Sequence, residues 1–347
     1  MEILSAHGRD LERAAKALKA GLLVAFPTET VYGLGGDAFN PSALAGIFEA
    51  KNRPRFDPLI IHIADMEALD RIVDIGALGR AARERLSVLS ATLWPGPLTL
   101  ILPKRPELPG LASAGLATAA VRFPAHPVAQ KLILLSTGAV AAPSANAFGG
   151  LSPTRASHVI EQLGDKLDFI IDGGRTTVGV ESTVLDLCHD IPRILRPGGT
   201  SREAIETLIG PVELYAAPQA IEEDTAERSA FLSPGQMKSH YAPRTPLKLC
   251  KNGELSLLPE VPGEGRLYFS APMAADVKTT EKNMGNTEGV NTRVLSEKGD
   301  PREAAANLFD MLHELDSLGL SLIRAEEAPP GGLGEAINDR LKRGSCV

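Results

Sequence analysis

Residues 1–198 alternate between helical and strand periodicity, and this alternation is the feature that most constrains the fold of the chain. Helical periodicity predicts helices at 10–20, 41–50, 66–74, 77–93, 127–137 and 155–164. Apolar runs typical of strands lie at 22–26, 59–64, 97–103, 118–124, 139–142, 168–174, 181–187 and 193–198. Several of these strands follow one another with no helix between them, so they are not expected to form an all-parallel sheet. The sequence therefore predicts an α/β fold built on a twisted mixed sheet.

Two of the expected helices have clear capping signals. Asp10 is the expected N-cap of the first helix, and Gly21 is the residue expected to end it. Asn40 followed by Pro41 is a strong N-cap and first-turn pair for the second helix.

The second part of the chain is organised differently. Residues 211–245 are rich in Pro, Ala and acidic side chains and show no sustained periodicity, which is typical of a linker. After it, strands are expected at 246–250, 266–271, 292–296 and 320–326, and helices at 301–319 and 333–343. We therefore expect a catalytic domain at 1–210, a linker at 211–245, and a smaller, Rossmann-like α/β domain at 246–347.

The charge of the chain is unevenly distributed. It has 36 Lys and Arg against 43 Asp and Glu, a formal net charge of −7. Residues 1–210 carry 21 basic and 22 acidic side chains, net −1, and residues 211–347 carry 15 and 21, net −6. Nucleic-acid binders usually have a basic excess and, for single strands, aromatic stacking surfaces, whereas aromatic residues are only 4% here. Any phosphate chemistry should come from a few placed cations in the N-terminal part.

The cysteines and the N-terminus favour a reducing compartment and show no secretion signal. Cys188, Cys250 and Cys346 lie far apart, with no CxxC pair and no His cluster at ligand spacing, which argues against a structural zinc or a disulfide framework. The N-terminus lacks the apolar core of a signal peptide, and no run approaches the ~20 apolar residues of a membrane span. We expect a soluble, cytoplasmic protein.

The first polar segment is PTETVYGLGGDA at 27–38, interpreted as a strand end followed by a glycine-rich turn. Thr28, Thr30 and Tyr32 offer hydrogen-bond donors and acceptors, and the glycines allow close approach of a ligand. Neither GxGxxG nor a P-loop is present, so the segment has no dinucleotide or Walker signature. A purely structural turn explains the segment equally well.

The next segment, KNRPRFDPLIIHI at 51–63, places Lys51, Arg53 and Arg55 after a helix end and His62 in an apolar strand. The cations could simply complement the helix C-terminus, and such a histidine is more often a core residue than a ligand. Three further segments lie at 121–127, 142–154 and 179–199. Ser144 and Asn146 follow a buried strand, where ligands collect in α/β sheets, although a plain Ser or Asx turn is the alternative.

Taken together and in this order, these segments resemble the YrdC-like family of threonylcarbamoyl-AMP synthases. The hallmark Lys-x-Arg stands here as Lys51-Asn52-Arg53, and the later Ser-x-Asn as Ser144-Ala145-Asn146. The resemblance covers about residues 8–210. The segments SPGQMKSHYAP (233–243) and GLGEAINDRLKRG (332–344) are similar to the longer, two-domain form of the family, which extends the resemblance over the whole chain.

The resemblance implies a nucleotidyltransferase that makes L-threonylcarbamoyl-adenylate and pyrophosphate from L-threonine, bicarbonate or CO2, and ATP. The product would be passed to a tRNA threonylcarbamoyl transferase complex for modification of adenosine 37. ATP would be a substrate, and Mg²⁺ would arrive with the nucleotide, because the sequence shows no carboxylate cage. No protein metal site, no membrane contact and little or no direct tRNA binding are expected.

The resemblance also implies roles for individual residues. Lys51 and Arg53 would be catalytic. Contacts with ATP would come from Arg53, Thr118, Ser144, Asn146, Ser152 and Arg196. L-threonine would be held by Thr30, His62, Arg122, Ala142 and Ser182, with Arg122 as the natural bidentate partner of its carboxylate. A carboxylate beside a triphosphate is repulsive unless a metal intervenes, so Asp57 is not expected to touch the phosphates directly.

The linker segment 233–243 carries Lys238, His240 and Tyr241 in an otherwise acidic stretch. The hypothesis is that it folds over the site as a lid and excludes water from a labile mixed anhydride.

Two other classes of function stay open on the sequence. The chain could be a module that binds double-stranded RNA or tRNA through the Lys51–Arg55 cluster, which the near-neutral charge and scarce aromatics disfavour. It could also be a carbamoyl-phosphate-using transferase or a hydrolase of adenylates on the same scaffold, which would differ in its products.

Overall fold

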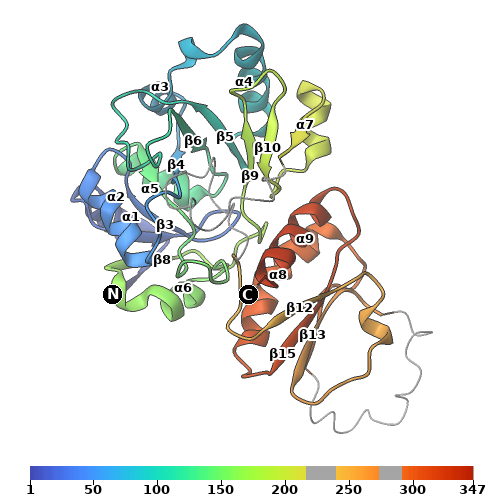
Figure 1. Cartoon of the computed structure of the whole chain (residues 1–347). Helices are drawn as coiled ribbons and strands as arrows, with labels where there is room; N and C mark the ends of the chain where they lie inside the picture. The colour runs from blue at the N-terminus through green and yellow to red at the C-terminus, as the bar shows by residue number, and fades with distance from the viewer. Residues whose placement is uncertain (216–239, 273–290, 347) are drawn as a thin grey trace, which may run out of the picture. The chain divides into compact units, whose positions relative to one another are not determined.

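A computed structural model of the chain describes residues 1–215, 240–272 and 291–346 (Figure 1). The described residues divide into two compact units. The first comprises 1–148, 153–177 and 181–215, and the second comprises 149–152, 178–180, 240–272 and 291–346. Two short segments of the N-terminal part thus belong to the second unit.

The first unit is built on a mixed sheet of 11 strands. In spatial order its strands are β1 (Glu2–Ser5), β8 (Phe169–Asp172), β2 (Val24–Phe26), β3 (Gly33–Asp37), β7 (Ala139–Ala141), β4 (Ile60–Ile63), β6 (Thr118–Arg122), β5 (Leu98–Pro103), β9 (Thr183–Asp186), β10 (Arg193–Arg196) and β11 (Glu213–Leu214). Strands β4 and β6 are parallel, whereas β7 and β5 run antiparallel to them on either side. The mixed sheet expected from consecutive strands is confirmed.

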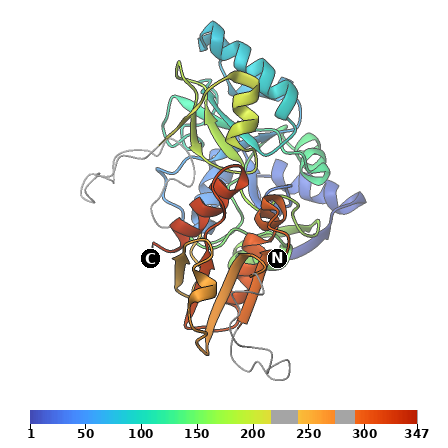
Figure 2. The same ribbon diagram turned by 90° about the vertical axis from the view of Figure 1, so that its right-hand side faces the viewer.

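Helices cover both faces of this sheet, as the 90° view in Figure 2 also shows. They are α1 (Gly8–Lys19), α2 (Pro41–Lys51), α3 (Glu67–Ile72), α4 (Arg80–Leu93), α5 (Pro127–Leu135), α6 (Ala156–Leu163) and α7 (Arg202–Ile209). Val24 and Phe26 pack in one apolar cluster with α1 and α5, and Ala25 packs in the other with the remaining helices. This is the two-face alternation of a strand buried on both sides.

The capping signals are confirmed for one helix and corrected for the other. The Asn40 side chain accepts from the backbone N–H groups of Ser42 and Ala43, with Pro41 in the first turn. Helix α1 begins earlier than expected, with His7 in the N-cap position. Asp10 lies inside its first turn and accepts from the N–H of Ser5.

The glycine-rich turn expected after Tyr32 is wrong, because residues 33–37 form strand β3 between β2 and β7. A Cβ on Gly35 would lie 2.7 Å from the ring of Phe26. Glycine at position 35 therefore allows strand β3 to pack closely against the ring of Phe26. Strand β1, helix α7 and strand β11 were also not expected, and β11 lies inside the segment interpreted as linker.

The second unit contains a four-stranded parallel sheet in the order β12 (Leu247–Cys250), β15 (Leu322–Glu326), β13 (Glu264–Ser270) and β14 (Asn291–Ser296). Its helices are α8 (Pro301–Asp316) and α9 (Leu333–Gly344), drawn in orange to red in Figure 1. Leu308, Leu312 and Leu315 of α8 are fully buried, as their helical spacing predicts. The smaller α/β fold expected for this part of the chain is confirmed. Among the described residues, no helix combines the length and the apolar character that spanning a bilayer requires.

Candidate functional site

The Lys51 ammonium joins two of the segments that the sequence singles out. Lys51 is the last residue of α2, and Asn52 after it ends the helix in the left-handed conformation. The Nζ atom donates to the carbonyl oxygens of Ser144 (2.6 Å) and Asn146 (2.5 Å) in the loop after β7. Burial, and to a lesser extent the nearby charge of Arg53, lowers the pKa of Lys51 well below its usual value. The Lys-x-Arg and Ser-x-Asn segments therefore meet in space.

Arg53 is held by the turn that follows it. Its Nη2 atom lies 2.9 Å from the Asp57 carboxylate and donates to the carbonyl of Pro58. Burial raises the pKa of Asp57, against the attraction of Arg53, Lys51 and Arg196. Asp57 is therefore a buried ion-pair partner of Arg53, and the charges of Lys51 and Arg196 act on it as well.

Arg122 stands at the end of β6, with every nitrogen of its guanidinium close to an acceptor. Nε donates to the carbonyl of Gly96 (3.3 Å), Nη1 donates to Oγ1 of Thr30 (2.9 Å), and Nη2 lies 2.7 Å from Oε1 of Glu29. Thr30 Oγ1 is also 2.8 Å from Oγ1 of Thr28. Both charged side chains are more than nine-tenths buried. These contacts hold the guanidinium in one orientation, and a fixed guanidinium is suited to recognising a carboxylate.

The Glu29 carboxylate is ionised at neutral pH. Burial on its own raises the pKa of Glu29. The Arg122 guanidinium, with the backbone N–H groups of Glu29 and Ala125, outweighs burial and holds the net pKa below its usual value.

His62 lies on β4 beside Arg122 of β6, and its ring packs edge-on against Phe26. Burial, reinforced by the charge of Arg122, lowers the pKa of His62 to about 3, so the imidazole is neutral at physiological pH. Its Nδ1 atom is buried and has no hydrogen-bond partner within 1–215, 240–272 and 291–346. This histidine is therefore not a fully satisfied core residue.

Ser182 connects the Arg122 region with Arg196. Its Oγ atom lies 2.8 Å from Oγ1 of Thr99, and Thr99 is the register partner of Arg122 across β5 and β6. Arg196 donates to the carbonyl of Ser182 from Nε and Nη2. The main chain of 181–183 passes so close to Gly198 that a Cβ there would lie 2.4 Å from backbone atoms.

The remaining residues predicted from the resemblance lie as follows. Ala142 donates its N–H to the carbonyl of Ile60 directly before the Ser144 loop. Thr118 begins β6, four residues from Arg122, which is about 13 Å along a strand. Ser152 belongs to the second unit, where its carbonyl lies 3.2 Å from Nε2 of His313.

Two of the three residues predicted to form the lid are described, and Lys238 lies outside the described residues. His240 and Tyr241 are buried in the second unit, where the rings of the two residues are in contact. The guanidinium of Arg340 lies over the Tyr241 ring at 5.0 Å. The described end of the linker is thus packed onto α9.

Sequence reasoning missed Glu29 and Thr99. Glu29 is the neighbour of a predicted ligand, Thr30, in a segment already noted for its polar side chains. Thr99 is a buried residue of the apolar strand β5, and it carries a hydroxyl group. Neither residue could be identified from a local motif, because its partner is distant along the chain: Arg122 for Glu29 and Ser182 for Thr99.

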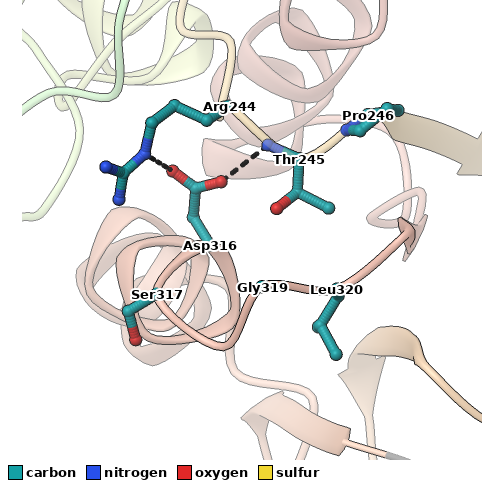
Figure 3. A pocket seen from close by; sticks show the side chains of 7 residues that line it. All are labelled: Arg244, Thr245, Pro246, Asp316, Ser317, Gly319 and Leu320. Atoms are coloured by element: carbon teal, nitrogen blue, oxygen red, sulfur yellow. Dashed lines mark hydrogen bonds and ion pairs between the residues drawn. The ribbon is translucent and has the colours of Figure 1, made fainter.

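The second unit has an open pocket of about 420 Å³ (Figure 3). Asp316 accepts from the N–H of Thr245 (2.7 Å) and pairs with Arg244 (3.3 Å). In Figure 3 both groups point at the same carboxylate. These polar groups satisfy one another, so the pocket is a structural junction at the start of β12.

Comparisons with known proteins cover almost the whole chain. A family model described as "Telomere recombination" (Sua5, YciO and YrdC) matches residues 16–198, and one described as "Threonylcarbamoyl-AMP synthase, C-terminal domain" matches 200–346. The threonylcarbamoyl-AMP synthase of Pyrococcus abyssi is 42% identical, with 96% of this chain and 93% of that protein covered. The synthase of Bacillus subtilis is 40% identical, with 98% and 94% covered.

Two solved structures are similar over the full length. The crystal structure of Pyrococcus abyssi Sua5 complexed with L-threonine has a TM-score of 0.84 at 38% identity, covering 99% of this chain and 98% of that one. A variant of the same protein, with a histidine and the following tyrosine replaced by alanine, has a TM-score of 0.82 at 37% identity, covering 99% and 96%.

Proposed function

This chain belongs to the threonylcarbamoyl-AMP synthase family in its two-domain form, and we propose that it makes L-threonylcarbamoyl-adenylate. The substrates are L-threonine, bicarbonate or CO2, and ATP, and the second product is pyrophosphate. The chain then acts as a nucleotidyltransferase, and its product serves a separate transferase that modifies adenosine 37 of tRNA.

The observation that carries this proposal is the connection between Arg122 and Arg196 through Thr99 and Ser182. Arg122 provides a rigid guanidinium suited to the carboxylate of an amino acid. Arg196 belongs, with Lys51 and Arg53, to the cations around Asp57, and cations of this kind neutralise phosphates. The connection supports one site that holds an amino acid beside a nucleotide.

The chemistry of this site needs positioning more than covalent catalysis. A carbamate on the threonine nitrogen is already a nucleophile, so one of its oxygens attacks the α-phosphorus and pyrophosphate leaves. We assign the ATP contacts to Arg53, Thr118, Ser144, Asn146, Ser152 and Arg196. We assign the L-threonine contacts to Thr30, His62, Arg122, Ala142 and Ser182.

Lys51 takes part through the Ser144–Asn146 loop, which its ammonium binds in this structure. Its catalytic role, like the lid role of Lys238, His240 and Tyr241, stays a prediction. Within the described ranges no group of three or more His, Cys, Asp or Glu side chains is placed to hold a metal ion. We infer from the family's use of ATP that Mg²⁺ enters with the ATP phosphates.

The burial of the cations argues against an RNA-binding module. Lys51 and Arg53 are 2% and 7% exposed, which leaves little of either cation to meet an RNA backbone. Electrostatic RNA binding requires several accessible cations on one face.

The test is pyrophosphate release by the full-length protein with ATP, bicarbonate and single amino acids. We expect release that requires both L-threonine and bicarbonate and that yields the adenylate. Serine should support weaker release, because one methyl group discriminates by only about 10- to 200-fold. Release that ignores bicarbonate, or an equal response to every amino acid, contradicts the proposal.

A further inference from the structure

Glu29 and Arg122 form an ion pair that leaves hydrogen-bonding capacity unused on both sides. Oε1 of Glu29 is 2.7 Å from Nη2 of Arg122, yet the two atoms are not aligned for a hydrogen bond. Across the described residues, neither carboxylate oxygen of Glu29 nor the Nη2 of Arg122 makes a well-aligned hydrogen bond. The backbone N–H groups of Glu29 and Ala125 lie close enough to lower the Glu29 pKa but do not meet this alignment. Buried polar atoms of this kind are rare in folded proteins, because each carries a desolvation cost.

The unused groups are complementary and adjacent. The guanidinium offers a buried N–H donor, and the carboxylate beside it offers buried acceptors. A zwitterionic α-amino acid presents the opposite pair, a carboxylate that accepts and an ammonium that donates, two bonds apart. The Glu29–Arg122 pair therefore has the polarity needed to receive both charged ends of one amino acid.

On the basis of the proposed function, we propose that Glu29 binds the α-ammonium group of L-threonine while Arg122 binds its carboxylate. Glu29 is then a substrate-binding residue, and it orients the nitrogen that becomes the carbamate. Thr30 remains hydrogen-bonded to the other side of the guanidinium, at Nη1. The arrangement selects substrates with a free α-amine.

The test compares two ligands that share a carboxylate and a hydroxyl but differ in the amine. L-threonine and the 3-hydroxybutyrate of matching configuration are titrated calorimetrically into the full-length protein without ATP. The variants are Glu29→Gln and, as a control for losing one buried carboxylate of the same unit, Asp186→Asn. Asp186 accepts from the N–H of Cys188 at the far end of β9.

We expect the wild type and Asp186→Asn to bind L-threonine at least about 10-fold more tightly than the deamino ligand. In Glu29→Gln this ratio should fall by about 10-fold, while affinity for the deamino ligand changes much less. Equal weakening of both ligands would show that Glu29 only supports Arg122, and would overturn the proposal. Equal affinity of the wild type for both ligands would overturn it without any variant.

Glu29→Asp is a second variant, included in case Glu29→Gln does not fold. It keeps the charge but withdraws the carboxylate by one methylene, so we expect a smaller loss of the threonine preference. An unchanged preference in a folded Glu29→Asp or Glu29→Gln protein contradicts the assignment. Because binding is measured without turnover, threonine binding without pyrophosphate release would refute the proposed function and still decide the role of Glu29.

Discussion

Lys51 Nζ donates hydrogen bonds to the carbonyl oxygens of Ser144 and Asn146, at 2.6 and 2.5 Å, and so joins the end of α2 to the loop after β7. Lys51 and Asn146 are 95 positions apart in the sequence. The Lys51 side chain is buried in this contact. The loop that presents Ser144 is therefore shaped by a residue of the neighbouring segment.

Replacing Lys51 by methionine should remove activity and weaken the fold together. The carbonyls of Ser144 and Asn146 would lose a buried donor, which costs about 1–3 kcal/mol of stability. We expect pyrophosphate release to fall at least about 100-fold. Urea denaturation and a pyrophosphate assay measure the two effects, with exposed Lys16→Met as the control. Full activity in Lys51→Met would contradict this role of the ammonium.

Arg122→Lys should weaken threonine binding while leaving ATP binding intact. Lysine keeps the charge but loses the planar fork, whose three separate nitrogens lie close to Thr30, Glu29 and Gly96. We expect the dissociation constant for L-threonine to rise about 10- to 100-fold in calorimetry, with less than about a threefold change for ATP. Arg71→Lys, at a peripheral arginine, is the matched control. Comparable losses for both ligands would indicate general disruption of the sheet.

His62 should make the protein less stable in mild acid. Its pKa is about 3 in the folded state against a usual value of 6.5, so the unfolded chain binds a proton that the folded chain excludes. Stability then falls as the pH drops from 6.5 toward 3, by about 2 kcal/mol at pH 5. In His62→Leu this part of the pH dependence should disappear. Urea denaturation at pH 7 and pH 5 measures it, with His7→Leu as the control, and an identical slope in His62→Leu would refute it.

Ser182→Ala should weaken the effect that bound ATP has on the affinity for L-threonine. The hydroxyl contacts Thr99 and lies 3.3 Å from Nη2 of Arg196, whereas the Ser182 carbonyl that also binds Arg196 remains. In the wild type, we expect bound ATP analogue to raise the affinity for L-threonine, and in Ser182→Ala this coupling should fall by about 1 kcal/mol. Titrating threonine with and without the analogue measures it. Ser113→Ala, a buried serine in the 110–116 turn, should keep the coupling.

The family resemblance read from the Lys-x-Arg and Ser-x-Asn motifs is confirmed by the family models and by the full-length relatives. Those motifs could be recognised because they are local, with each pair of side chains two positions apart. The helix begun by Asn40 and Pro41 was predictable for the same reason, since its capping groups are neighbours in sequence.

Strand β3 was not predictable from local signals, because three glycines in five residues do not favour a strand. It forms because β2 and β7 pair with it and because Phe26 fills the space that side chains would occupy. Tertiary packing overrides the local preference at this point.

The sequence by itself determined the α/β character of the chain, its family and most of its helices and strands, since periodicity, caps and short motifs act over a few residues. The tertiary structure alone decided which polar groups face each other: Glu29 against Arg122, Asp57 against Arg53, and Ser182 between Thr99 and Arg196. The physical reason is that strand order sets these contacts. Strands far apart in sequence become neighbours in the mixed sheet, and burial there strengthens each electrostatic interaction.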